Sequence, residues 1–114
     1  MDTKYLVVDN NVDNSESYAQ AVDLMKSGEV VAFPTETVYG LGAVATNDEA
    51  VKKIFVAKGR PSDNPLIVHI GTKDELKNYV SDIPPVAQKC IDAFWPGPLT
   101  LILQAKQNLF APSV

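Results

Sequence analysis

The sequence is poor in residues that could cross-link a small chain. It has one cysteine, Cys90, in 114 residues, so no disulfide can form within the chain. It also has one histidine, His69, and no set of residues at metal-ligand spacing. These shortages predict a reducing compartment and no metal site made by the protein itself.

Long apolar runs and an excess of positive charge are also lacking. No stretch reaches the roughly 18 apolar residues that a membrane-spanning helix needs, and the start "MDTKYLVVDNNVDN" has no signal-peptide pattern. We therefore expect a cytoplasmic protein with no membrane partner. The formal net charge is −4, which excludes bulk attraction to nucleic acid and leaves only a local basic patch for such binding.

The composition, with 46% hydrophobic and 21% charged residues, is that of one ordinary globular domain. Short β-branched runs alternate with segments of helical periodicity, which predicts an α/β class with a mixed sheet. A further short strand is expected within residues 35–46. The expected helices cover residues 15–27, 47–59, 72–80 and 84–95, and the expected strands cover residues 5–9, 29–33, 66–70 and 99–104.

The helix boundaries carry residues with known capping preferences. We expect a hydroxyl or amide side chain to cap the start of the first three helices, and glycine to end the first two. The predicted caps are Ser15 or Ser17, then Asn47, then Thr72 with Glu75 as a capping box, and the predicted ends are Gly28 and Gly59.

The segment "AKGRPSDNPLIVHI" (57–70) places an ammonium, a guanidinium and an amide in one loop. Arg60 and Asn64 each precede a proline, which holds them in extended geometry. Lys58, Arg60 and Asn64 on a fixed loop would suit a polyphosphate. The alternative is that Lys58 and Arg60 only end a helix and the rest is a solvated turn. The residues alone leave both interpretations open.

His69 falls between Val68 and Ile70 in an apolar run, and strand alternation predicts that it points away from both. One interpretation is a substrate-binding imidazole at the mouth of a pocket. The other is a half-buried strand histidine with its hydrogen bonds satisfied.

The segment "FPTETVYGLGA" (33–43) follows a predicted strand and offers the hydroxyls of Thr35 and Thr37. Gly40 and Gly42 would let a ligand approach the backbone closely. It is not a Walker A loop, since that motif occurs nowhere in the chain. The alternative is a plain strand–turn–strand connection.

The segment "FWPGPLTLIL" (94–103) is interpreted as a packing corner that joins a helix to a strand. Cys90, on the preceding helix, is interpreted as a core side chain rather than a nucleophile, because no basic partner is placed nearby.

These three segments occur in an order and spacing that resemble the YrdC-like threonylcarbamoyl-AMP synthase family, from about residue 18 to the end. The resemblance implies a twisted mixed sheet flanked by helices, with a concave, positively charged cavity. It implies a nucleotidyltransferase that makes L-threonylcarbamoyladenylate from L-threonine, bicarbonate and ATP and releases pyrophosphate. Downstream proteins would then transfer the threonylcarbamoyl group to transfer RNA, giving N6-threonylcarbamoyladenosine.

The resemblance also implies roles for individual residues. Mg²⁺ is implied as the companion of ATP, because it would stabilise charge on the phosphate oxygens. The implied ATP-binding residues are Lys58, Arg60 and Asn64, of which Lys58 and Arg60 form the catalytic cationic pair. The implied threonine-binding residues are Thr37 and His69, with Thr35 as a weaker neighbour.

The family's domain continues past the point where this sequence stops. Its second half carries a Ser-x-Asn pair in an "APSAN"-like motif, and Ser113 in "FAPSV" falls too early to be assigned to it. We therefore expect residues 1–114 to be the N-terminal portion of a single YrdC-like domain, with an incomplete sheet and no activity alone.

Two other functions stay open. One is a double-stranded RNA-binding, ribosome-associated YrdC-like module, although only four of the ten basic residues cluster, at Lys52, Lys53, Lys58 and Arg60. Weak RNA binding is the most that this charge balance predicts. The other function is that of the related carbamoyl-transfer domain of hydrogenase maturation, which would use the same adenylation chemistry for a different purpose.

Overall fold

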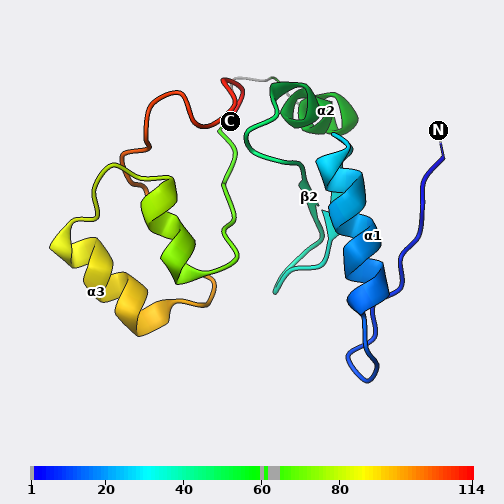
Figure 1. The fold of residues 1–114 in the computed structure, drawn as a ribbon, viewed down its shortest axis with the longest axis horizontal. Helices are drawn as coiled ribbons and strands as arrows, with labels where there is room; N and C mark the ends of the chain where they lie inside the picture. Colours follow the sequence, from blue (N-terminus) through cyan, green and yellow to red (C-terminus); the bar gives the residue numbers. More distant parts are fainter. Residues whose placement is uncertain (1, 60, 62–64) are drawn as a thin grey trace.

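The computed structural model of the chain describes residues 2–59, 61 and 65–114. The elements follow in the order α1 (Ser15–Lys26), β1 (Val31–Phe33), β2 (Gly40–Gly42), α2 (Asp48–Lys58), the 3₁₀ helix η1 (Lys73–Asn78) and α3 (Pro85–Phe94). The predicted class of mixed helices and strands is confirmed. Figure 1 shows two halves: α1, both strands and α2 form one, and η1 and α3 lie in the other. The C-terminal segment returns from α3 to α2 and so joins them.

Helix α1 begins and ends close to the predicted residues, but its cap is different. Ser15 lies inside the helix, and both its backbone N–H (3.0 Å) and its hydroxyl (2.5 Å) donate to Asp13 Oδ1. Ser17 donates its hydroxyl to the carbonyl of Val7 instead of capping. The prediction of a serine cap is therefore wrong, because a carboxylate just before the helix reaches the free N–H first. The predicted end is confirmed, with Gly28 in the left-handed region at φ 88°.

Helix α2 confirms both of its predicted boundaries. Asn47 accepts a hydrogen bond from the backbone N–H of Ala50 through its side chain, at 3.2 Å. Gly59 ends the helix at φ 64°, which a residue without a Cβ adopts at little cost. The buried face of this helix supplies half of the buried apolar residues: Ala50, Val51, Ile54 and Phe55.

The predicted capping box forms only in part. Thr72 makes no side-chain bond at the start of η1. Glu75 does reach back, but its Oε2 accepts from the backbone N–H of Gly71 at 3.1 Å. The tighter turn of a 3₁₀ helix changes which N–H the carboxylate faces. Helix α3 is confirmed and has Pro85 in its first turn, where no backbone donor is needed.

The sheet of the described residues consists of β1 and β2, paired antiparallel with Val31 opposite Gly42 and Phe33 opposite Gly40. The strands predicted over residues 5–9, 66–70 and 99–104 do not form in the described part of the chain. Residues 99–104 lie next to an isolated bridge between Val80 and Ala105. Beside this bridge, the Ser81 N–H donates to the carbonyl of Gln104 at 2.9 Å. An apolar alternating run becomes a strand only when another strand accepts its backbone hydrogen bonds.

The main cluster of buried apolar residues lies between α2 and the C-terminal segment. Val51, Phe55 and Ala111 form it, and Leu66 and Val114 pack against it. Two hydrogen bonds donated by backbone N–H groups of the segment hold it there. The Ala111 N–H donates to the carbonyl of Ala45 at 2.9 Å, and the Ser113 N–H donates to Asp48 Oδ1 at 3.0 Å.

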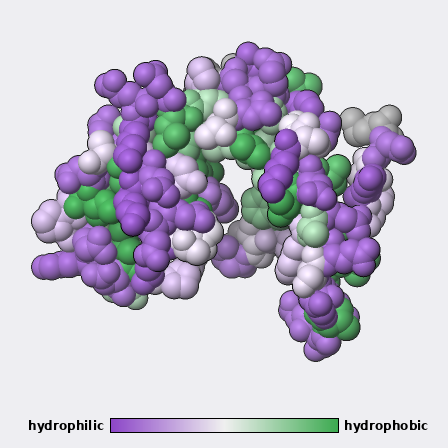
Figure 2. All heavy atoms as spheres, in the orientation of Figure 1, coloured by the Kyte–Doolittle hydropathy of each residue, from purple (hydrophilic) through white to green (hydrophobic). Residues whose placement is uncertain are grey.

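The molecule is open for its length. Its Cα radius of gyration is 15.5 Å, against about 13 Å for a compact chain of this size. Several large apolar side chains are exposed, including Tyr5 (90%) and Ile102 (99%). Figure 2 shows a hollow between the two halves. Within the described residues, no helix is both long and apolar enough to span a bilayer.

The docking of the C-terminal segment predicts a dependence of stability on pH. The salt bridge from Lys52 (3.0 Å) and the hydrogen bond from Ser113 lower the pKa of the Asp48 carboxyl. A lowered folded-state pKa stabilises the fold above the unfolded-state pKa, and this contribution disappears as the pH falls through the folded-state value. We expect Asp48→Asn to lower the melting temperature by a few degrees at neutral pH.

This deficit should begin to narrow as the pH falls below the ordinary aspartate value of about 4, where the unfolded wild-type chain takes up a proton. It should disappear once the pH is also below the lower folded-state pKa of Asp48. The difference in melting temperature between the variant and the wild type is measured by thermal unfolding, followed by circular dichroism at several pH values. Asp74→Asn, in the first turn of η1, is the matched control and should cause no such deficit. A deficit in Asp48→Asn that is equal at every pH would contradict this role of the carboxylate.

Candidate functional site

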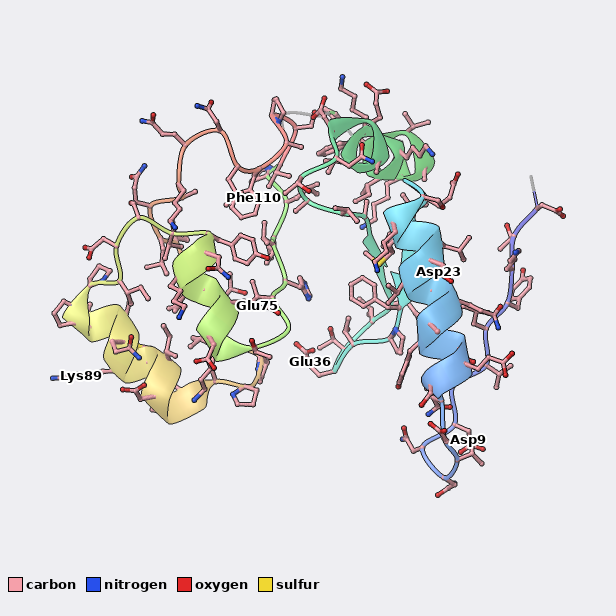
Figure 3. All side chains as sticks on the ribbon, viewed as in Figure 1. Asp9, Asp23, Glu36, Glu75, Lys89 and Phe110 are labelled. Atoms are coloured by element: carbon pink, nitrogen blue, oxygen red, sulfur yellow. The ribbon has the colours of Figure 1, made fainter. Side chains whose placement is uncertain are left out.

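The loop between β1 and β2 presents two hydroxyls, and one of them shapes the loop. Thr35 Oγ1 accepts a hydrogen bond from the Thr37 N–H at 3.2 Å, donates to the carbonyl of Val38, and lies 3.5 Å from Thr37 Oγ1. Both side chains are exposed. Thr35 therefore closes the turn, whereas Thr37 keeps hydrogen-bonding capacity for a ligand. Glu36, which lies between them in the sequence, is at the tip of the loop that joins β1 to β2 (Figure 3).

Phe33, the last residue of β1, lies over the two glycines of β2. A Cβ built on Gly40 would come within 2.9 Å of Phe33 Cζ, and one built on Gly42 within 2.8 Å of Phe33 Cε1. At such distances a side chain at either position would have to displace the Phe33 ring. The Phe33 ring thus gives a structural reason for both glycines, beside the close approach of a ligand that the sequence suggested. An aromatic side chain laid across strand glycines is a known way to stabilise such a pair.

The same ring contacts His69 in the segment that precedes η1. The two ring centroids are 5.6 Å apart, with an interplanar angle of 76°, which is a T-shaped arrangement. Favourable aromatic pairs have this geometry. His69 and Ile67 are exposed, whereas Leu66, Val68 and Ile70 are half-buried, so the predicted alternation around His69 is confirmed. The structure thus places His69 beside Phe33, the last residue of β1, which precedes Thr35 by two residues.

The predicted cationic group is described only at its first residue. Lys58 is exposed in the last turn of α2. Arg60 and Asn64 lie outside the described residues. Among the described contacts, none joins Lys58 to the hairpin or to His69. The structure therefore places His69 against Phe33, the residue from which the loop with Thr35 and Thr37 begins, and places Lys58 on a separate element.

No metal site is formed by the part of the chain that the structure describes. It contains no cluster of three or more His, Cys, Asp or Glu side chains that could hold an ion.

The segment 94–103 turns sharply after a helix, as expected from its sequence, but leads into no strand in the described part of the chain. Helix α3 ends at Phe94, and the Trp95 indole N–H donates to the carbonyl of Leu99 at 2.9 Å. A Cβ on Gly97 would come within 2.6 Å of the Phe94 carbonyl oxygen, so only glycine fits. Cys90 is a half-buried free thiol on the same helix.

Phe33 is the site residue that the sequence analysis missed. It was noted only as the end of a strand, before the hydroxyl-rich loop. The signal that could have found it is the spacing of Gly40 and Gly42, which puts both glycines on one face of a strand. An aromatic residue on the paired strand is the natural cover for that face.

Proteins named threonylcarbamoyl-AMP synthase are similar to this chain. It is 54% identical over 108 residues to the one from Bacillus subtilis (strain 168), covering 95% of this chain and 31% of the relative. It is 55% identical over 83 residues to the one from Pyrococcus abyssi (strain GE5 / Orsay), covering 73% of this chain and 24% of the relative. A crystal structure of P. abyssi Sua5 complexed with L-threonine matches with a TM-score of 0.81 at 47% identity, covering 86% of this chain and 28% of that chain.

The chain thus spans less than a third of the length of these relatives. The family model Sua5_yciO_yrdC, described as telomere recombination, matches residues 23–114. This match covers most of the chain and confirms the resemblance seen in the three sequence motifs. The chain therefore belongs to the Sua5_yciO_yrdC family.

Proposed function

We propose that this chain supplies threonine- and ATP-binding elements of a threonylcarbamoyl-AMP synthase. The observation that carries the proposal is its 54% identity, over 95% of its length, to the B. subtilis protein of that name. The similar fold of the P. abyssi structure that holds L-threonine supports the same substrate. The product would be L-threonylcarbamoyladenylate, used in the modification of transfer RNA.

The hairpin loop and His69 are the proposed threonine-binding elements. Thr37 offers a hydroxyl that can donate or accept, and His69 offers a ring nitrogen of either kind. Thr35 contributes indirectly, since its hydroxyl is already bonded within the loop. The exposure of Thr37 and His69 supports this assignment, because a ligand can reach both side chains.

Lys58, Arg60 and Asn64 are the proposed ATP-binding residues. The neutral amine of threonine forms a bond to the bicarbonate carbon, with loss of water, and gives a carbamate. A carbamate oxygen then bonds to the α-phosphorus, and the bond to the bridging oxygen breaks so that pyrophosphate leaves with the electron pair. Negative charge on the phosphate oxygens is stabilised by the ammonium of Lys58 and the guanidinium of Arg60.

The remaining components are proposed from the chemistry. Mg²⁺ would arrive bound to the phosphates of ATP and would offset their charge. The proteins that transfer the threonylcarbamoyl group to transfer RNA are the proposed downstream partners, and the cytoplasm is the proposed location. The relatives are named as synthases, so their names lend no support to the alternative of a double-stranded RNA-binding module.

The proposed function predicts that pyrophosphate release depends on all three substrates. We expect the full-length protein to release pyrophosphate when ATP, bicarbonate and L-threonine are present together, measured with a coupled phosphate assay. L-Valine, which replaces the threonine hydroxyl with a methyl group, is the matched control and should support little release, because a site built for a hydroxyl rejects the analogue without one. Release that proceeds equally without threonine would sink the proposal.

The proposed phosphate contact of Arg60 predicts a selective loss of ATP affinity. We expect Arg60→Ala to raise the KM for ATP roughly tenfold or more, because a charge-assisted hydrogen bond is removed. Its melting temperature should stay near that of the wild type. Lys89→Ala, an exposed cation on α3, is the control and should leave the KM unchanged. A large drop in melting temperature with an unchanged KM would show that Arg60 is only a structural helix-end residue.

A further inference from the structure

We propose that Phe33 is a positioning residue that holds His69 in place for threonine binding. This inference rests on the proposed function, because it needs His69 to contact the substrate. Phe33 itself need not touch threonine. It acts through the imidazole, by setting where that ring lies relative to the loop that carries Thr37.

The position of the Phe33 ring is set by the strand pairing. Phe33 is opposite Gly40 in the ladder, and Gly42 lies on the same face two residues further along. The ring fills the space where both side chains would begin, at 2.9 Å and 2.8 Å from the positions of the absent Cβ atoms. The ring therefore lies against β2 at both glycines.

His69, in contrast, has little backbone support. Its segment, residues 65–70, has no ladder partner, and no described hydrogen bond joins it to β1 or β2. Leu66 anchors the start of the segment in the cluster on α2. Near its end, the described contact to the hairpin is the T-shaped pair of His69 with Phe33. The aromatic pair therefore determines the placement of the imidazole.

A variant without the ring should lose threonine affinity and keep ATP affinity. Phe33→Leu keeps an apolar side chain over the glycines but removes the aromatic partner of His69. We expect the KM for L-threonine to rise about three- to tenfold, the usual worth of such a pair. The KM for ATP and kcat at saturating threonine should stay within about twofold, because Lys58 lies on a different element.

Two variants serve as matched controls in the full-length protein. Phe33→Tyr keeps a ring in the same place and should restore a KM for threonine close to that of the wild type. Phe110→Leu makes the same substitution in the other aromatic pair, Tyr79 with Phe110, whose centroids are also 5.6 Å apart. It should leave the KM for threonine unchanged. Equal effects of Phe33→Leu and Phe110→Leu would overturn the proposal in favour of general destabilisation.

Two further variants separate this inference from the function on which it rests. His69→Ala should raise the KM for threonine at least as much as Phe33→Leu does. If His69→Ala weakens threonine binding while Phe33→Leu does not, positioning is refuted and the role of His69 stands. If neither has an effect, both assignments fall. Should Phe33→Leu fail to fold, Gly42→Ala displaces the ring by contact with Cε1, and an unchanged KM for threonine in that variant would equally refute positioning.

Discussion

The arrangement of the hairpin and of His69 depends on one aromatic ring. Phe33 lies across Gly40 and Gly42 and contacts His69 edge to face. Backbone pairing of only three residues in each strand gives little stability by itself, so the ring adds apolar contact where two glycines offer none. The same contact links a segment that has no ladder partner to the loop that carries the threonines. Local structure and the proposed substrate site thus share one interaction.

The second half of the molecule is held by a different constraint. The C-terminal segment docks on α2 through apolar contacts of Ala111 and through the bond from Ser113 to Asp48. Asp48 also pairs with Lys52, so one carboxylate serves both the helix and the docked segment. Because Leu66 packs against this cluster, the docking also determines where the segment that carries His69 begins.

The helices and the two paired strands could be predicted from the sequence, since β1 and β2 lie within the ranges expected for strands. The strands expected over residues 5–9, 66–70 and 99–104 did not form in the described part of the chain. Asn47 and Gly59 mark the ends of α2 because capping depends on residues that are close in sequence. Residues 66–70 and 99–104 have strand composition but remain outside any ladder, since pairing depends on neighbours that are distant in sequence. The proposed threonine-binding residues followed from family motifs, whereas Phe33 could be recognised only from the pairing of β1 with β2. For Arg60 and Asn64, the assignment still rests on the motif alone.

We propose that Phe33 affects threonine binding only through His69. A double-mutant cycle of Phe33→Leu and His69→Ala, with threonine affinity measured by titration calorimetry in the full-length protein, tests this directly. We expect the double variant to bind threonine as His69→Ala does, because the ring then has no imidazole to position. Effects of the two substitutions that multiply independently would contradict it.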